Sequence, residues 1–279
     1  MSPRRLLIST TVDNTLEGMN LLKGLVTAFR TLTILPLPGQ DAPKHSASLP
    51  FFPLVGLALG LLLWAISLIN RVISGGGWPM GVAALMLLAS IVSTRSLHLD
   101  GLADLADAVG GGWDRAQRLE IMKDTRLGVF GGVAVIVVLL FKWLAFSRLV
   151  AADSTVWIIL VLMISRTMQV HLAVRLDYAR AEGGTAASFV NEASGYHFAA
   201  ACIITLMVAL VLGPLGLAVL VVAEIITRAY AAWCRKNIGG ITGDLLGAGN
   251  EIVEVVLLFL AASLGNQLPV YTGWGWLIH

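Results

Sequence analysis

The chain has 279 residues, of which 57% are hydrophobic and only 13% are charged, and its mean hydropathy is +0.83. This composition excludes an ordinary soluble domain and is typical of a polytopic helical membrane protein. A formal net charge of +2, without a basic patch interleaved with aromatic residues, argues against nucleic-acid binding.

The amino-terminal part divides into a lead and an amphipathic segment. We expect residues 1–18 to be a disordered lead without a cleavable signal peptide, because Arg4 and Arg5 precede only a short apolar stretch. From Met19 to Pro36, Lys23 and Arg30 share one helical face and apolar residues lie opposite. This pattern predicts an interfacial or re-entrant amphipathic helix rather than a membrane span.

Long apolar stretches then predict about seven transmembrane helices. Their approximate ranges are 50–70, 79–97, 127–150, 155–175, 198–212, 215–233 and 248–264. Gly213 and Pro214 break the fifth from the sixth and predict a tight hairpin. The expected fold is all-α: one membrane-embedded catalytic domain over residues 19–264, followed by a short tail at 265–279.

The distribution of basic residues predicts the orientation. If the first span starts in the cytoplasm, fifteen of the nineteen Lys and Arg residues lie on the inner side. The positive-inside rule then places the amino terminus in the cytoplasm and the carboxyl terminus outside. It also predicts cytoplasmic loops at about 98–126, 176–197 and 234–247 of an inner-membrane protein.

The first of these loops opens with three aspartates on one helical stripe. Asp100, Asp104 and Asp107 occupy positions i, i+4 and i+7, which lie within about 60° of arc on an α-helix. Acids at a helix start can simply favour the helix dipole and face solvent. Here the stripe directly follows an apolar span, so we favour a site for a hard divalent cation such as Mg²⁺, which also binds substrate phosphates.

The other inner loops carry further polar candidates. Asp244 and Glu251 share a face at the start of the last span, beside glycines that either admit a ligand or serve helix packing. Asp124 and Arg126 form either part of the site or a local surface ion pair of little energetic value.

Charged residues inside the spans need partners because an unpaired charge in hydrocarbon is expensive. Glu224 and Arg228 are four positions apart, which predicts a structural pair. Arg166 must find an acid on another helix or an anionic ligand, Lys142 must pair or extend toward the interface, and we expect His171 to be a hydrogen-bonded packing residue.

At these residues the sequence closely resembles the cobalamin synthase family, from about Met19 to Leu264. The motifs, in chain order, are Leu32-Thr-Ile-Leu-Pro36, Phe52-Pro53-Leu-Val-Gly56, His98-Leu-Asp-Gly-Leu-Ala-Asp104 with Asp107, Met122-x-Asp124-x-Arg126-Leu-Gly128, Ser165-Arg166, Tyr178-Ala-Arg180 with Glu182-Gly183, and Gly240-x-Thr242-Gly243-Asp244-x-Leu246-Gly247 with Glu251 and Glu254. The lead and the tail have no match, so no function is carried onto them.

The resemblance implies the joining step of nucleotide-loop assembly in vitamin B12. The family transfers the cobinamide phosphate moiety of adenosylcobinamide-GDP to α-ribazole or its 5′-phosphate and releases GMP, with Mg²⁺. The metal ligands expected on this basis are Asp100, Asp104, Asp107, Asp244 and Glu251. The groups expected to contact the substrate phosphates are Lys123, Arg126, Arg166, Arg180 and Thr242, and the expected catalytic acids are Asp104, Asp124 and Asp244.

Two other classes remain open at this stage. A membrane phosphotransferase of the CDP-alcohol type also holds metal on an aspartate stripe, but its pattern wants Ala-Arg after Asp-Gly, and Asp100-Gly-Leu-Ala-Asp104 has no Arg there. A cation-coupled transporter should carry its acids at mid-bilayer, whereas these acids gather at the cytoplasmic ends. Oligomeric state is left open.

Overall fold

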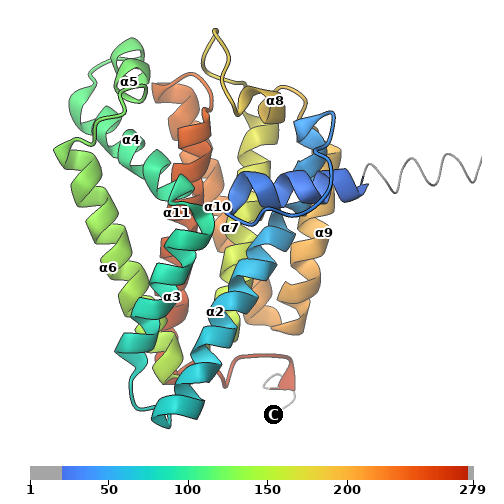
Figure 1. Ribbon diagram of the computed structural model, residues 1–279, viewed down its shortest axis with the longest axis vertical. Coiled ribbons are helices and arrows are strands. Elements are labelled where there is room, and N and C mark those ends of the chain that lie inside the picture. The colour runs from blue at the N-terminus through green and yellow to red at the C-terminus, as the bar shows by residue number, and fades with distance from the viewer. Residues whose placement is uncertain (1–20, 276–279) are drawn as a thin grey trace, which may run out of the picture.

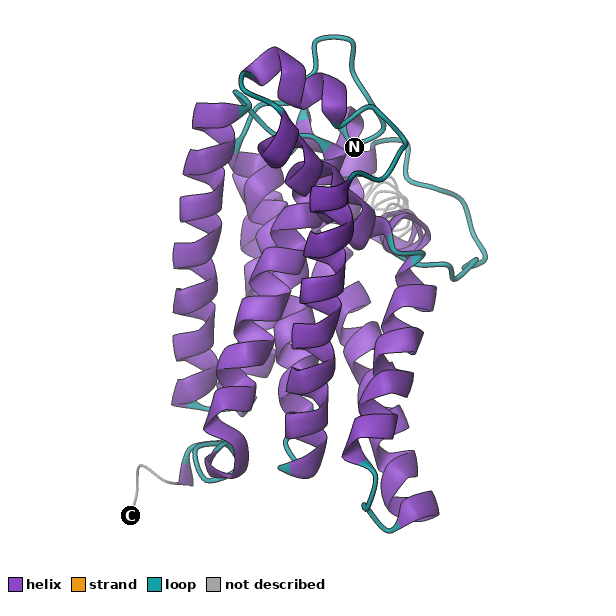
Figure 2. Cartoon of the chain, turned by 90° about the vertical axis from the view of Figure 1, so that its left-hand side faces the viewer, coloured by secondary structure: helices purple, strands orange, loops and turns teal. Residues whose placement is uncertain are grey.

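Helices form at every stretch that the sequence predicts to span a membrane. The computed structural model describes residues 21–275, and the expected lead at 1–18 lies outside this part. After a helical segment at 21–32, the elements are η1 (His45–Phe51), α2 (Phe52–Ser74), α3 (Pro79–Thr94), α4 (Leu97–Gly111), α5 (Arg115–Ile121), α6 (Val129–Ala151), α7 (Val156–Arg175), α8 (Ala187–Val190), α9 (Gly195–Val211), α10 (Pro214–Asn237), α11 (Gly243–Leu264) and η2 (Gly265–Gln267). The long helices run side by side as a bundle (Figures 1 and 2), which confirms the all-α class.

The number of membrane spans is lower than expected. Five helical stretches in the described part are long and apolar enough to cross a bilayer, and up to six if α3 and α4 count as one bent span. The helix α9 has 17 residues and falls below this length. The chain is therefore an integral membrane protein, but a count of seven spans is not confirmed.

The helix α7 is the core of the bundle, and α6 faces outward. In the most apolar stretch of α7, 94% of the residues are buried inside the protein, whereas in the corresponding stretch of α6 only 22% are buried. Gly56 and Gly60 let α2 approach α7 closely, since a Cβ at Gly60 would lie 2.6 Å from the Cα atom of Ile159. Exposed Val133, Ile136, Leu140 and Leu144 follow one face of α6, as expected for a lipid-facing helix.

A sharp bend separates α3 from α4. Arg95 and Ser96 both have left-handed backbone conformations, with φ of 52° and 56°, and the two helix axes differ by 87°. The helix α4 therefore turns away from the axis of α3, toward the end of the bundle where α5 and α8 also lie (Figure 1). Gly101 packs directly on α11, since a Cβ there would lie 2.3 Å from the carbonyl oxygen of Asp244.

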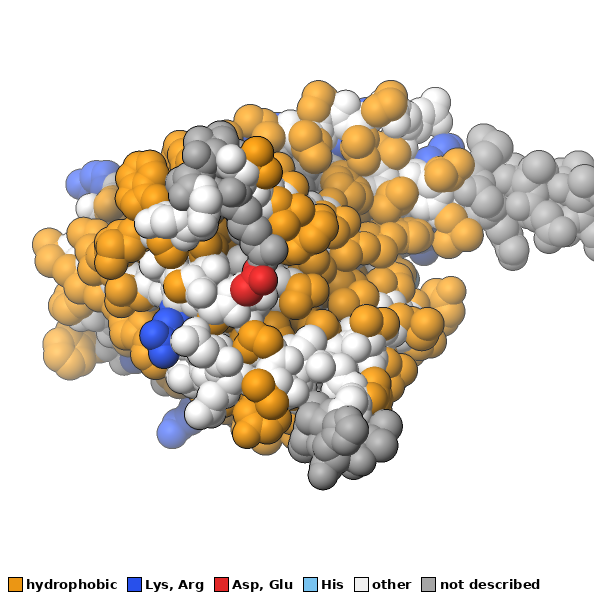
Figure 3. Space-filling model, turned by 90° about the horizontal axis from the view of Figure 1, so that it is seen from below, with side chains coloured by type: hydrophobic (Ala, Val, Ile, Leu, Met, Phe, Trp, Pro, Cys, Tyr) orange, Lys and Arg blue, Asp and Glu red, His pale blue; other side chains and the backbone are white. Residues whose placement is uncertain are grey.

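The helical segment at 21–32 runs nearly perpendicular to the long helices, in blue in Figure 1. This arrangement agrees with the predicted interfacial helix. Its end is fixed by Arg30, which donates hydrogen bonds to the carbonyls of Leu37 and Gly39 and pairs with Asp41. The opposite end of the bundle, seen in Figure 3, shows mostly hydrophobic and uncharged atoms with few charged side chains.

Candidate functional site

Three aspartates from two distant parts of the chain lie near enough at the end of the bundle for their charges to interact. Asp100 and Asp104 lie on α4, and Asp244 lies in the first turn of α11, on which α4 packs. Partial burial and the negative charges of Asp244 and Asp100 raise the pKa of Asp104 to about 7. Removing a carboxylate from water and placing like charges beside it both favour its protonated form. These neighbouring carboxylates therefore need a positively charged partner.

Arg180 supplies part of that compensation. Its guanidinium donates a hydrogen bond to Asp244 Oδ2 at 2.8 Å and another to the carbonyl of Met122 at 3.3 Å. The Thr242 hydroxyl caps α11 by accepting from the backbone N–H of Leu245 at 3.3 Å, and it also donates to Asp244 at 3.4 Å. The structure therefore brings three predicted residues, Arg180, Thr242 and Asp244, together.

A short backbone pairing holds these loops in register. The N–H of Ala179 donates to the carbonyl of Ile241 at 2.9 Å, and the N–H of Ile241 donates to the carbonyl of Asp177 at 2.9 Å. Gly240, with φ of 159°, lets the backbones meet, because a Cβ there would lie 2.3 Å from the Asp177 carbonyl oxygen. Arg180 is thereby fixed opposite the start of α11.

A cavity of about 510 Å³ opens beside these groups. Asp100, Arg180 and Asp244 line it, together with His98 and Gln169. The rest of its lining comes from the 21–32 segment, η1, α2 and α8, from the loop that carries Tyr178 and Thr185, and from residues of α4, α7 and α11. Such a concave, largely apolar cavity with a few convergent polar groups is the usual form of a small-molecule site.

Asp107, the third member of the predicted stripe, has a different role. Its two carboxylate oxygens accept hydrogen bonds from the N–H groups of Gly128 and Gly131, each at 2.8 Å. These donors belong to the start of α6, where the N–H groups lack partners within the helix. Asp107 therefore caps α6 from a neighbouring helix and does not line the cavity.

The predicted residues of the 122–128 segment lie in the solvent-facing loop. Asp124 and Arg126 pair with each other at 2.6 Å, and the Arg126 side chain is 88% exposed. The hydrogen bonds from Arg126 lower the pKa of Asp124 to about 2. Lys123 forms an ion pair with Glu182. None of these four side chains lines the cavity, and Asp124 and Arg126 form the local ion pair that the sequence left open as one of two interpretations.

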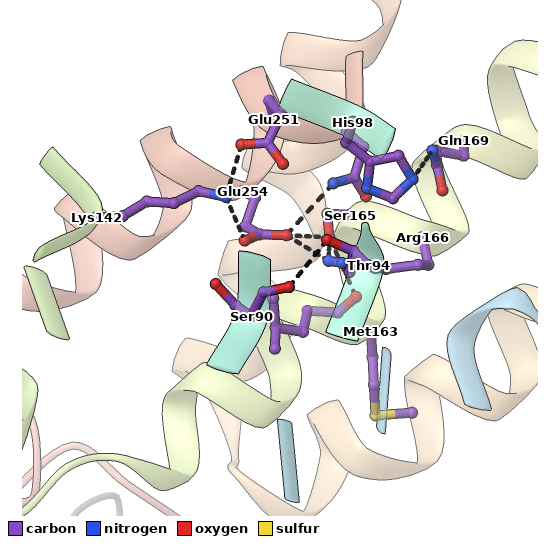
Figure 4. Close-up of polar contacts among 12 residues, drawn as sticks. Ser90, Thr94, His98, Lys142, Met163, Ser165, Arg166, Gln169, Glu251 and Glu254 are labelled. Atoms are coloured by element: carbon purple, nitrogen blue, oxygen red, sulfur yellow. Dashed lines mark hydrogen bonds and ion pairs between the residues drawn. The ribbon is translucent and has the colours of Figure 1, made fainter. Parts of the chain in front are cut away.

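Glu251 and Arg166 belong to a buried group of four charges in the middle of the bundle (Figure 4). Lys142 lies 2.6 Å from Glu251 and 2.7 Å from Glu254, and Arg166 pairs with Glu254 and with the Ser165 hydroxyl. We call Lys142, Arg166, Glu251 and Glu254 the charge box. The structure does not bring Glu251 or Arg166 to the aspartates, because each is held by an opposite charge on another helix. Lys142 and Arg166, the two cations predicted to need partners inside the spans, thus each pair with a glutamate of α11.

The expectations for α7 and α10 are confirmed. Glu224 and Arg228 pair at 2.6 Å along one helical face. His171 lies 2.8 Å from Glu224 through Nδ1 and stacks on Phe198 with ring centroids 4.5 Å apart.

Two cavity residues escaped the sequence prediction as site residues. His98 and Gln169 are 3% and 4% exposed, and their side chains meet at 3.0 Å between His98 Nε2 and Gln169 Nε2. His98 stood out only as the residue that precedes the aspartate stripe. The available signal for Gln169 was an amide in an apolar span, near one helical turn after Arg166.

The predicted ligand set does not close around a metal ion by itself. Among residues 21–275, no three His, Cys, Asp or Glu side chains converge closely enough to hold one. Asp100, Asp104 and Asp244 still lie near enough for their charges to interact. A cation at this position would need additional oxygens, such as those of a substrate phosphate.

These features define a class: a polytopic helical membrane protein with an acidic cavity, bearing one arginine, at one end of its bundle. Residues 24–262 match the family model described as cobalamin-5-phosphate synthase. The chain belongs to this family, which confirms the resemblance seen in its motifs.

Relatives named adenosylcobinamide-GDP ribazoletransferase support the same assignment. Those of Chlorobaculum parvum and Chlorobaculum tepidum are each 45% identical over 246 residues, covering 87% of this chain and 96% of theirs. That of Syntrophobacter fumaroxidans is 43% identical over 245 residues, covering 86% and 98%. No solved structure matches the chain.

Proposed function

We propose that the chain joins adenosylcobinamide-GDP to α-ribazole or its 5′-phosphate, giving adenosylcobalamin or its 5′-phosphate and GMP. Family membership supports the activity, as does the relatives' shared name. The observation that carries the proposal is the cavity in which Asp100, Asp244 and Arg180 meet. It combines acids that suit a cation with a guanidinium that suits phosphate oxygens.

The reaction requires charge neutralisation above all. A ribose hydroxyl of the acceptor attacks the phosphorus that bears cobinamide, an O–P bond forms, and the bond to the GMP oxygen breaks. Negative charge grows on the leaving phosphate, so positioned cationic groups lower the barrier. Arg180 lines the cavity that the diphosphate would occupy, and its hydrogen bonds to Asp244 and to the Met122 carbonyl hold it there.

The donor chemistry of the site fits Mg²⁺. Asp100 and Asp244 line the cavity and offer only oxygen ligands, which a hard divalent cation prefers. These two carboxylates would hold the ion together with substrate phosphate oxygens, while Asp104 lies beside them, with its pKa raised by burial and by their negative charges. When bound, Mg²⁺ would supply positive charge to the diphosphate. Asp107 and Glu251 are omitted from this set because the α6 amides occupy both Asp107 oxygens and Glu251 pairs with Lys142.

The hydroxyl proton also needs an acceptor. Asp104, with a pKa of about 7, is best suited among the expected catalytic acids, since a base works best near the operating pH. Asp124 is poorly suited because Arg126 lowers its pKa to about 2. We assign Asp104 this role and Asp244 the role of orienting Arg180.

We also propose that the protein lies in the inner membrane with its cavity open to the cytoplasm, its amino terminus inside and its carboxyl terminus outside. Fifteen of nineteen Lys and Arg residues then lie on the inner side. Adenosylcobinamide-GDP and the 5′-phosphate of α-ribazole carry charged groups that do not cross a bilayer unaided, which favours a site on the side where they are made.

The test is turnover by the purified protein with adenosylcobinamide-GDP, α-ribazole 5′-phosphate and Mg²⁺. We expect a cobalamin product and stoichiometric GMP, both lost when EDTA removes the metal. Asp104→Asn should abolish turnover while the protein remains folded in the membrane. Asp114→Asn is the matched control, because asparagine caps α5 as well as aspartate does. Absence of a cobalamin product from the wild type would refute the assigned activity.

A further inference from the structure

The part of the cavity lined by η1, α2 and α8 is built from rings and apolar side chains. The His45 and Phe189 rings lie 5.2 Å apart between centroids, and the Phe189 and Phe52 rings lie 6.3 Å apart. Leu49 completes the lining contributed by η1. We call His45, Leu49, Phe52 and Phe189 the aromatic wall.

The aromatic wall differs in chemistry from the acidic part of the cavity. The two acids that line the cavity, Asp100 and Asp244, come from α4 and α11, whereas the wall contributes no carboxylate. Tilted ring pairs at these separations leave ring faces and edges for a further aromatic group, which prefers the same offset or edge-to-face arrangements. The acids and the rings that line the cavity therefore come from different elements of the fold.

Size limits what this part can hold. A cavity of about 510 Å³ is in the range that encloses one drug-sized ligand. A corrin macrocycle with its side chains and adenosyl group exceeds that size, so it must remain largely outside. A guanine base would fit by size, but its edge carries several donors and acceptors, and among the four residues of the aromatic wall only His45 has side-chain nitrogens to pair with them.

We propose that the aromatic wall binds the dimethylbenzimidazole ring of the acceptor, α-ribazole or its 5′-phosphate, and sets the preference for an apolar base. This inference rests on the proposed function and assigns one substrate to one part of the same cavity. The ribose would then extend from the wall toward Asp104 and Arg180, which places its hydroxyl at the acidic side.

The wall is held together across two segments that are far apart in the chain. Glu192, just after α8, accepts a hydrogen bond from the Ser46 hydroxyl at 3.2 Å and lies 3.7 Å from Lys44 Nζ. Both partners flank or belong to η1. These contacts keep Phe189 beside His45, so the wall exists before the acceptor arrives.

The test is Phe189→Ala, with steady-state kinetics for each substrate varied separately. Losing a stacking partner should raise the KM for α-ribazole 5′-phosphate about tenfold, with kcat and the KM for adenosylcobinamide-GDP changed by less than about twofold. Phe189→Trp should restore most of the affinity, and Phe189→Leu should not. The matched control is Phe259→Ala, because Phe259 is 47% exposed on α11 and pairs only with Phe141 among aromatic rings of the described part.

Three results would overturn the inference: an unchanged KM for α-ribazole 5′-phosphate, a rise confined to adenosylcobinamide-GDP, or equal rises for both substrates. Equilibrium dialysis measures the affinity of the wild type and of Phe189→Ala for α-ribazole 5′-phosphate directly, and we expect the variant to bind it more weakly. If the variant still binds adenosylcobinamide-GDP, the weaker binding cannot be explained by misfolding. Failure of the proposed function is distinguishable, because the wild type itself would then form no cobalamin.

Discussion

The charge box offers the sharpest test of how this bundle is held together. Lys142, Arg166, Glu251 and Glu254 form two cations and two anions that are each at most 4% exposed. Their charges cancel, so the group is neutral as a whole. Glu254→Gln keeps the size of the side chain but leaves two cations facing one anion inside the protein.

The expected cost follows from that imbalance. Glu254 contacts both Lys142, at 2.7 Å, and Arg166, so its loss leaves Arg166 without its acid. Removing one partner of a buried ion pair typically costs about 3–5 kcal/mol. We therefore expect the free energy of unfolding to fall by about 3–5 kcal/mol. The double variant Lys142→Met with Glu254→Gln restores neutrality and should lose at least about 1 kcal/mol less than the sum of the single variants.

The measurement is reversible unfolding in mixed detergent micelles with increasing SDS, followed by tryptophan fluorescence. Arg126→Gln is the control, because Arg126 forms its ion pair with Asp124 in the solvent-facing loop, with 88% of its side chain exposed. That exposed pair should contribute little to the free energy of unfolding. A change below about 1 kcal/mol for Glu254→Gln, or strict additivity in the double variant, would refute the electrostatic reasoning.

Three further outcomes follow from the cavity and its supports. Asp107→Ala should destabilise the protein by about 1–2 kcal/mol because α6 loses its cap, whereas Asp107→Asn should lose less, as thermal unfolding of the two variants would show. The raised pKa of Asp104 means that the folded state binds this proton more tightly than the unfolded state, so metal-free protein should lose stability as the pH rises from about 4 to about 7. Asp104→Asn should remove that part of the pH dependence, and an unchanged slope of melting temperature against pH would contradict the assignment. Arg180→Lys should raise the KM for adenosylcobinamide-GDP about tenfold, since an ammonium cannot reproduce the planar fork beside Asp244; equal kinetics for lysine and arginine would argue against direct phosphate contact.

The amino-acid sequence by itself determined the helices and the place of the acidic residues along them. Apolar stretches of membrane-spanning length must satisfy their backbone groups internally, so helices at these ranges follow from composition alone. The Glu224 and Arg228 pair was equally predictable, because the contact lies within one helical turn. The family motifs likewise depend only on residue order.

Tertiary structure alone decided which of the unusual residues meet. Glu254 is 112 positions from Lys142 and 88 from Arg166, so nothing in local periodicity could pair them. The 87° bend after α3 sends Asp107 to the start of α6 while Asp100 and Asp104 stay beside α11. Aspartates of one helical stripe therefore have two roles: Asp107 binds backbone amides of α6, and Asp100 lines the cavity. The packing of the helices, and not the spacing of the residues along the chain, decides which partner each carboxylate has.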